Sequence, residues 1–345
     1  MALATIIETK GSTPQIQGAS AIFSEGGLIC GTLGGGILEA CAEKNALEVL
    51  KKRISFLYEH SLEDLISQEG GAICGGIVTI LIDASPGKHE DVFRNLKKSL
   101  LARKPGILAT LIENPSRKDF SLSRCWIREE NSLDDLKTPP LSFFRKEIKQ
   151  AFREKEVNLI KADKKMPDGF RREGFLFLEP LSPLPQLVIA GAGHIGQAVA
   201  KLGSFLNFEV TVIDDRPEFA NSDRFPDADK IIVDNIGKSI RNFPIASDTY
   251  VIIVTRGHRH DAEALRECIN REAAYIGMIG SRQKVSLMRE KFLQEGWAPS
   301  EKLDCIYAPI GIDIHSTTVE EIAVSIAAQL VLIRYQNQEK KRREV

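Results

Sequence analysis

The chain has 345 residues, more than one hydrophobic core usually serves, so two domains are expected. Hydrophobic residues make up 43% of the chain and charged residues 27%, and 46 basic residues nearly balance 47 acidic ones. This balance argues against a nucleic-acid-binding protein, which more often carries a basic excess. The first residues are too polar for a signal peptide, and no apolar run has the length of a membrane span, so no membrane association is expected.

The six cysteines are scattered along the chain, without a CxxC pair or a His/Cys cluster at zinc spacing. A disulfide framework is uncommon in a chain of this length. The pattern therefore predicts reduced, mostly buried thiols in a cytoplasmic protein.

In the N-terminal half, apolar patterning predicts strands over residues 3–8, 19–23, 77–84, 106–112 and 174–178. It predicts helices over residues 37–52, 88–103 and 142–156. Residues 114–140 are polar and show little periodicity. We expect a mixed α/β domain over residues 1–179, with its motifs in 1–84 and a less defined part in 85–179.

Residues 180–185, PLSPLP, contain three prolines and predict a stiff linker. Beyond them, strands are expected at 186–190, 209–214, 230–233, 250–255, 275–279 and 305–308, alternating with helices at 195–206, 261–272, 282–295 and 319–335. This rhythm predicts a Rossmann-type domain over residues 186–335, a doubly wound parallel sheet with helices on both faces. Residues 336–345 are expected to form a charged, frayed tail.

The strongest motif is a G-x-G-x-x-G pattern at Gly191, Gly193 and Gly196, which follows a predicted strand and opens a predicted helix. In such a turn the first glycine allows the tight bend, the second admits a phosphate close to the backbone, and the third lets the helix pack on the strand. His194 lies inside the same turn, where helix amides face an anion. Asp214 ends the next strand at about the expected separation, where an acid can bind ribose hydroxyls. A glycine-rich turn that binds no ligand is the alternative.

A second motif is Cys74, Gly75 and Gly76, just before an apolar strand. Glycines beside a cysteine leave the thiol accessible, and an accessible thiol near cations can attack, carry sulfur or ligate a soft metal. An inert small residue at the start of a strand is an equally supported alternative.

The loop GTLGGG contains Gly34, Gly35 and Gly36 and runs directly into a predicted helix with Glu39 in its first turn. Its backbone amides form a second place where an anion could bind. A turn shaped only by packing explains the glycines equally well.

Two further candidates stand at the ends of predicted strands in the C-terminal half. His258 and Asp261, within TRGHRHD, could transfer protons, whereas their spacing is poor for a metal site. Gly280 and Ser281, within GSR, could contribute a phosphate contact. A solvated loop is the alternative at 255–261.

Together these motifs resemble the XdhC/CoxI family, the xanthine dehydrogenase accessory factors. The resemblance runs from residue 3 to about residue 335, and only 85–175 lacks recognisable motifs. It rests on GSTP, GTLGGGILE and CGG in the N-terminal half, and on LVIAGAGHIG, VIDDR, RFPDAD, YIGMIGSRQK, PIGIDI and EEIAVSIAAQL in the C-terminal half.

The resemblance implies a chaperone rather than an enzyme. It implies binding of molybdenum cofactor (molybdopterin), protection of it while a cysteine desulfurase sulfurates it, and delivery to an apo molybdenum hydroxylase such as xanthine dehydrogenase. Carried onto this sequence, the family motifs are Cys74, Gly75 and Gly76, with Cys74 as a transient molybdenum ligand; Gly191, Gly193, Gly196, Asp214 and Arg216; and His258 with Asp261.

The chain departs from the family pattern at Arg256, where many members have histidine, at Val319, usually proline, and at Gln329, usually glutamate. Two other functions fit the glycine motif. One is an NAD-dependent oxidoreductase with His258 as proton donor, and the other is a non-catalytic nucleotide-sensing regulator. Two-domain chains of this kind often associate, so a homo-oligomer is expected.

Overall fold

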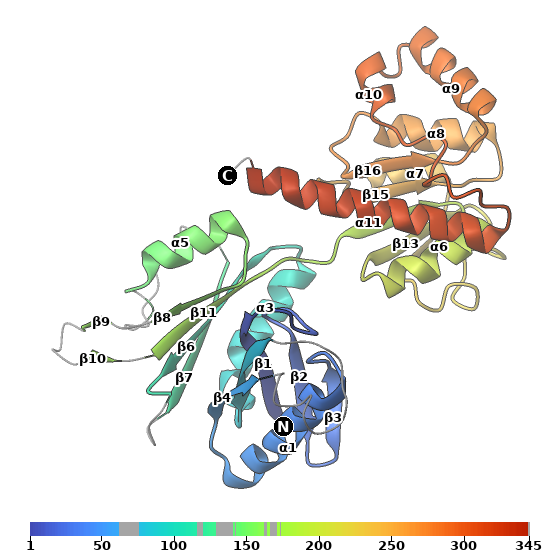
Figure 1. Ribbon diagram of the computed structural model, residues 1–345. Helices are drawn as coiled ribbons and strands as arrows, with labels where there is room; N and C mark the ends of the chain where they lie inside the picture. The colour runs from blue at the N-terminus through green and yellow to red at the C-terminus, as the bar shows by residue number, and fades with distance from the viewer. Residues whose placement is uncertain are drawn as a thin grey trace. The chain divides into compact units, whose positions relative to one another are not determined.

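The computed structural model describes residues 1–61, 76–115, 120–128, 141, 143–161, 164–165, 171–172 and 174–343 (Figure 1). The chain divides into two compact units, Met1–Pro183 and Leu184–Val345, here called the N-terminal and C-terminal units. Each is described by itself.

The N-terminal unit contains a five-stranded antiparallel sheet in the order β3-β2-β1-β5-β4. Helix α1 (Gly36–Lys52) packs on one of its faces, because Ala42, Ala46 and Val49 meet the buried side chains of alternate strand positions. The strands are β1 (Ala2–Lys10), β2 (Ser20–Ser24), β3 (Gly27–Gly31), β4 (Phe56–Ser61) and β5 (Ile77–Asp83).

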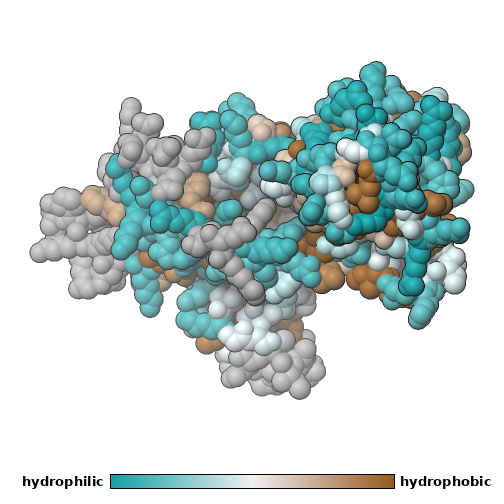
Figure 2. Space-filling model, turned by 90° about the horizontal axis from the view of Figure 1, so that it is seen from above, coloured by the Kyte–Doolittle hydropathy of each residue, from teal (hydrophilic) through white to brown (hydrophobic). Residues whose placement is uncertain are grey.

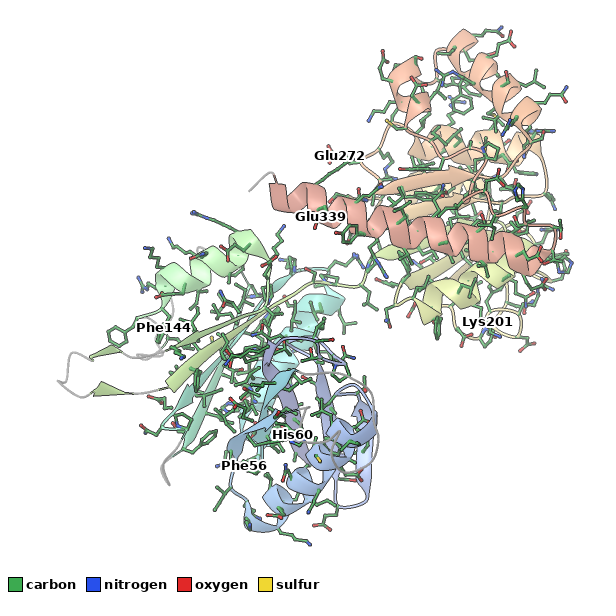
Figure 3. The ribbon with its side chains drawn as sticks, viewed as in Figure 1. Phe56, His60, Phe144, Lys201, Glu272 and Glu339 are labelled. Atoms are coloured by element: carbon green, nitrogen blue, oxygen red, sulfur yellow. The ribbon has the colours of Figure 1, made fainter. Side chains whose placement is uncertain are left out.

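A second, four-stranded antiparallel sheet has the order β7-β6-β11-β8. On one face it is covered by α5 (Arg145–Glu154), with Phe144 buried in the shared core (Figure 3). Its strands are β6 (Gly106–Glu113), β7 (Ser121–Ile127), β8 (Asn158–Lys161) and β11 (Gly174–Leu181). The remaining elements of the unit are η1 (Pro86–His89), α3 (Glu90–Leu101) and the two-residue strands β9 (Lys164–Lys165) and β10 (Arg171–Arg172).

The two sheets of the N-terminal unit face each other. Ile7 and Leu81 from the first sheet form one buried cluster with Ile112 and Phe177 from the second. The layers are therefore helix, sheet, sheet and helix, and the less patterned part of the chain supplies the second sheet.

The pattern did not predict the strands β3, β4, β7 and β8 of this unit, nor the two-residue strands β9 and β10. In β7, Arg124 is only 8% exposed and forms a buried ion pair with Asp83. In β4, Phe56 and His60 share the strand with the exposed Glu59 (Figure 3), so its apolar alternation is short. In β4 and β7, charged residues thus interrupt the alternation of apolar and polar positions by which a strand is recognised in a sequence.

The C-terminal unit contains a five-stranded sheet in the order β14-β13-β12-β15-β16, in which all neighbours are parallel. This is the doubly wound arrangement predicted from the sequence. Its strands are β12 (Gln186–Ala190), β13 (Glu209–Asp214), β14 (Lys230–Val233), β15 (Thr249–Ile253) and β16 (Tyr275–Met278). The helices are α6 (His194–Phe205), α7 (Ile236–Asn242), α8 (His258–Cys268), α9 (Arg282–Gln294), α10 (Ser300–Asp304) and α11 (Val319–Arg343).

Helices cover both faces of this sheet (Figure 1). Residues of α6 and α11 pack with one set of alternate strand positions, such as Leu187 and Ile189. Residues of α7, α8 and α9 pack with the other set, such as Val188 and Ala190. Burial on both faces explains why these strands are continuous apolar runs.

The prediction of a strand at 305–308 is wrong. The only pairing of this segment is a single parallel bridge between Tyr307 and Gly277. In a parallel ladder the next donor after Tyr307 would be residue 309, which is proline and has no N–H. The backbone N–H of Ile310 donates instead to the carbonyl of Met278, at 3.1 Å.

Two expected boundaries also differ. Helix α11 continues through Arg343, so residues 336–343 are helical rather than frayed, and Asn337 donates to the carbonyl of Ala274 at 3.2 Å. Strand β11 includes Pro180 and Leu181 of the segment expected to be a linker. Strand β8 pairs only with 175–178 of β11, so Pro180 has β6 alone as a strand neighbour, the kind of position where a strand tolerates proline.

Hydrophobic residues on the face shown in Figure 2 gather in separate small patches among mostly hydrophilic ones. Within the described ranges, no helix combines the length and the apolar composition needed to cross a membrane. The cytoplasmic location stays a prediction.

Candidate ligand-binding site

The predicted residues of the C-terminal unit meet at one edge of its sheet. Because the strands are parallel, β12, β13, β15 and β16 all end at this edge, and α6, α8 and α9 begin there. In open α/β sheets the crevice outside the carboxyl ends of the strands is where ligands bind. The structure thereby gathers the glycine turn, Asp214, His258 and Ser281 at the edge that such sheets use for binding.

The three glycines of the turn have different surroundings. Gly191 has a φ of 118°, and a Cβ atom there would overlap the carbonyl oxygen of Val254. A Cβ atom at Gly196 would overlap the carbonyl oxygen of Gly191, so this glycine allows α6 to pack on the turn. At Gly193 a Cβ atom would meet nothing within 4 Å. The space beside the backbone is therefore empty at Gly193, whereas other backbone atoms fill it at Gly191 and Gly196.

Gly193 is also the N-cap of α6, so no side chain caps this helix. Among the residues that the structure describes, none accepts a hydrogen bond from the backbone N–H of Gly193, His194 or Ile195. Uncapped amides at a helix start, together with the positive end of the helix dipole, favour an anion.

Asp214 does not take the role expected for it. Its side chain is buried and accepts the backbone N–H of Ala192 at 2.8 Å, while Arg216 donates to both of its oxygens at 2.9 and 3.0 Å. Burial by itself would raise the pKa of Asp214, but these hydrogen bonds outweigh it and lower the pKa to about 2. The carboxylate therefore holds the glycine turn rather than offering itself to a ribose, and Arg216 is committed to it.

The guanidinium groups of Arg216 and Arg224 lie over the ring of Phe219, at 3.9 and 5.1 Å from its centre. Arg224 also donates to the carbonyl of Ala192 at 3.4 Å and to Gln197 at 3.2 Å. It belongs to the RFPDAD motif, to which the sequence assigned no role. Arg224 thus braces the turn from the loop that precedes β14.

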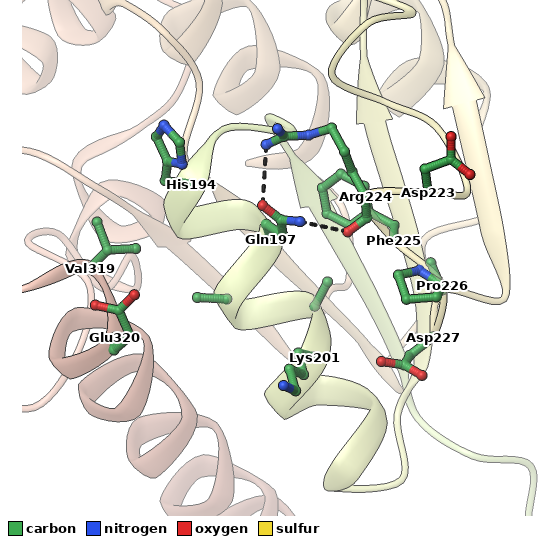
Figure 4. A pocket seen from close by; sticks show the side chains of 13 residues that line it. His194, Gln197, Lys201, Asp223, Arg224, Phe225, Pro226, Asp227, Val319 and Glu320 are labelled. Atoms are coloured by element: carbon green, nitrogen blue, oxygen red, sulfur yellow. Dashed lines mark hydrogen bonds between the residues drawn. The ribbon is translucent and has the colours of Figure 1, made fainter.

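A pocket of 520 Å³ adjoins the turn (Figure 4). His194, Gln197 and Lys201 of α6 line it, and α6 lies between Arg224 on one side and the start of α11 on the other. Among the described residues, the buried Nε of Arg224 has no hydrogen-bond partner. The candidate His194 is exposed at the mouth of this pocket.

Asp261 is 0% exposed, which contradicts a role in proton transfer to a ligand. One of its oxygens accepts the hydroxyl of Thr255 at 2.7 Å, and the other is paired with Lys284. Lys284 also donates to the carbonyl of Ile279 at 3.1 Å. Asp261 therefore fixes the ends of β15 and β16 relative to α9, and Lys284 is a structural residue that sequence reasoning missed.

His258 and Ser281 begin helices at the same edge. His258 is exposed in the first turn of α8. Ser281 caps α9 by accepting the backbone N–H of Lys284 at 3.2 Å, and Gly280 precedes it. The Ser281 hydroxyl of the GSR segment is thus used as a helix cap.

In the N-terminal unit, three motifs converge at one end of the first sheet. A Cβ atom at Gly34, whose φ is 111°, would lie 3.0 Å from Pro14 of the GSTP turn. A Cβ atom at Gly76 would overlap the carbonyl oxygen of Ser12 in the same turn. Cys74 and Gly75 lie outside the described residues.

The loop before α1 is held by an acid of its own. Glu39 accepts the hydroxyl of Thr32 at 2.8 Å and the backbone N–H of Leu33 at 3.0 Å. The Leu33 and Thr32 hydrogen bonds lower the pKa of Glu39. A Cβ atom at Gly35 or Gly36 would meet nothing within 4 Å. The space beside the backbone at the start of α1 is therefore empty, next to the segment that Glu39 holds.

Over the described ranges, no three or more His, Cys, Asp or Glu side chains are grouped so that they could hold a metal ion. The chemistry at the sheet edge is therefore that of backbone amides and cations. Fold and site together define a class: a two-unit α/β protein whose Rossmann-type sheet has a glycine turn followed by a helix without a side-chain cap.

Comparison with known proteins identifies the family. Residues 1–59 match the family described as XdhC and CoxI, and residues 187–330 match the XdhC Rossmann domain. The chain belongs to the XdhC and CoxI family, as its motifs indicated.

The relatives span most of the chain. A protein named as a probable xanthine dehydrogenase subunit, from Bacillus subtilis, is 25% identical over 334 residues, which cover 96% of this chain and 92% of that protein. The molybdenum cofactor insertion chaperone PaoD from Escherichia coli is 22% identical over 98% of this chain and 84% of its own length. A crystal structure described as a xanthine dehydrogenase from Bacillus halodurans superposes with a TM-score of 0.77 at 27% identity, covering 97% of this chain and 91% of that one.

Proposed function

We propose that the protein is a maturation chaperone that binds molybdenum cofactor through the glycine turn of its C-terminal unit. The observation that carries this proposal is the open backbone at Gly193, where α6 starts without a cap. A terminal phosphate is the anion that such a helix start favours, and molybdopterin carries one. The relative named as a molybdenum cofactor insertion chaperone supports the same ligand.

The proposal extends to the partners implied by the family. A cysteine desulfurase would sulfurate the bound cofactor, and an apo molybdenum hydroxylase such as xanthine dehydrogenase would receive it. The Bacillus subtilis relative, named for xanthine dehydrogenase, supports a recipient of this class. Cys74 supplies a thiol that protects or transiently ligates molybdenum, so Cys74→Ala lowers activation of the recipient while the fold survives.

NAD fits the site less well than a pterin phosphate. Recognition of the adenosine ribose in Rossmann domains uses a free acid at the end of the second strand. Asp214 occupies that position here, but Arg216 and the Ala192 amide already engage it. The amides at the start of α6 can still bind a phosphate, whereas Asp214 cannot bind the ribose.

The test compares two substitutions at one position. Gly193→Ala adds a methyl group in open space, at an extended backbone conformation that alanine adopts freely. Gly193→Asp places a carboxylate at the N-cap of α6, where it stabilises the helix and competes with an anion for the same amides. Each protein is purified anaerobically from a molybdate-fed host, and bound cofactor is quantified by mass spectrometry.

We expect the wild type to retain the cofactor, Gly193→Ala to retain less of it because its methyl group enters the space next to the amides, and Gly193→Asp to lose it, in both cases without a loss of thermal stability. If Gly193→Asp retained as much cofactor as the wild type, the cofactor would have to bind somewhere other than this turn. Absence of cofactor from the wild-type protein would remove the proposed function itself.

A further inference from the structure

A second compartment of the C-terminal unit lies between α8 and α9, which neighbour each other in Figure 1. It is a groove of 620 Å³ that starts at His258 and Lys284 at the sheet edge and extends to Arg266, Lys291 and Trp297. Arg266 lies eight residues beyond His258 in α8, so the groove is about 12 Å long at 1.5 Å per helical residue. Its volume lies within the range of small-molecule sites.

The far end of the groove carries two cations held in place by an aromatic ring. The guanidinium of Arg266 lies 4.9 Å from the centre of the Trp297 ring, and the ammonium of Lys291 lies 5.3 Å from it. Phe292 packs edge-on against the same ring, with 5.1 Å between ring centres. Cation–π contacts orient both cations without neutralising them.

The other cations of the groove are already compensated. Lys284 is paired with the buried Asp261, and Arg259 contacts Glu263 at 3.2 Å. Within the described part of the chain, neither Arg266 nor Lys291 forms an ion pair with an acid. The groove therefore has a surplus of positive charge at the Trp297 end.

The floor between these ends is apolar. Ala262 and Met288 are each 6% exposed and line the groove, and the side chain of Leu287 is 60% exposed at its rim. A ligand with a flat apolar body would bury the exposed Leu287 side chain, and an anionic group on it would pair with the uncompensated cations. The groove therefore suits a ligand that has both parts.

We propose that the groove between α8 and α9 binds a nucleoside monophosphate unit, with its phosphate at Arg266 and Lys291 and its base on the floor formed by Ala262, Leu287 and Met288. Neither end of this groove includes the glycine turn. The site is thus additional to the cofactor site and does not require cofactor to bind there.

Trp297 provides a direct readout, because the chain has two tryptophans and Trp126→Phe leaves Trp297 as the single one. The Trp126→Phe protein is titrated with GMP, AMP and CMP, with guanosine as a ring without phosphate and pyrophosphate as an anion without a ring. We expect a saturable change of Trp297 emission with at least one nucleotide, tighter than with guanosine or pyrophosphate, and weaker in high salt.

Two charge-reversal pairs test the location. Arg266→Glu with Lys291→Glu is expected to weaken nucleotide binding about tenfold or more, since it replaces two charge-assisted contacts by repulsion. Lys230→Glu with Lys302→Glu makes the same change of net charge at exposed residues outside the groove, and should leave the affinity unchanged. No saturable signal at millimolar nucleotide, or equal weakening by both pairs, would overturn the proposal.

Discussion

The side-chain amide of Gln329 joins α11 to the end of the parallel sheet through the hydroxyl of Tyr275, which donates to its oxygen. The same oxygen accepts the backbone N–H of Gly311 at 2.9 Å, and the amide nitrogen donates to the carbonyl of Gly311 at 3.1 Å. Burial raises the pKa of Tyr275, so its hydroxyl remains a donor. The glutamate usual in the family cannot make the third of these bonds without a proton.

Gln329→Leu should lower the free energy of unfolding by about 1–3 kcal/mol, because it leaves the hydroxyl of the buried Tyr275 and the Gly311 backbone without partners. Urea denaturation measures the loss. Gln336→Leu, on the exposed side of the same helix, is the matched control and should change stability little. Equal effects of both substitutions would contradict this role of the amide.

Gly191→Ala should destabilise the protein by more than about 1 kcal/mol, whereas Gly193→Ala should be nearly neutral. The reason is that Gly191 has a φ of 118° and faces the carbonyl of Val254, while Gly193 has an extended backbone and open space. Thermal unfolding of the two variants gives the comparison. A stable Gly191→Ala protein would show that the turn relaxes at little cost.

The pKa of Asp214, about 2 in the folded protein, predicts how stability depends on pH. An unfolded aspartate has a pKa of about 3.9, so the unfolded chain binds more protons between these values. The stabilisation by ionised Asp214 is complete above about pH 5 and is lost as pH falls towards 2, with a magnitude of about 2 kcal/mol.

Urea denaturation of the wild type and Asp214→Asn between pH 6 and pH 2 checks this dependence. The difference in stability between the two proteins should shrink as pH falls. A difference that is constant with pH would mean that Asp214 is not the titrating group.

The buried pair of Asp261 and Lys284 should behave as a structural unit. Lys284→Met leaves the carboxylate of Asp261 buried without its cation, and should destabilise the protein by about 3–5 kcal/mol. Asp261→Asn combined with Lys284→Met should recover part of that loss, because the uncompensated charge is gone. A double variant as unstable as the sum of its parts would argue that the two side chains act independently.

The parallel sheet and its glycine turn could be predicted because their signals are local. Runs such as 186–190 are apolar without interruption, and Gly191, Gly193 and Gly196 occur at fixed spacing next to a strand. The roles predicted for the residues next to this turn were less accurate. Asp214 has the right position, but its partner Arg216 takes the carboxylate that a ribose would need.

What could not be predicted depends on contacts between distant residues. Lys284 approaches Asp261 across 23 positions, and Arg124 approaches Asp83 across 41. No period or motif relates these pairs, so Arg124 looked like a surface residue and β7 was missed. The cations around Trp297 are likewise brought together by the packing of α8 against α9.

The cluster of Ile7, Leu81, Ile112 and Phe177 makes the first 84 residues dependent on the hundred that follow. A fragment ending at residue 84 would present Ile7 and Leu81 to water and leave Asp83 without Arg124. The motifs of residues 1–84 are therefore not expected to fold as a module without the second sheet. Deletions that trim the second sheet, within residues 106–181, should yield aggregated protein rather than a smaller functional one.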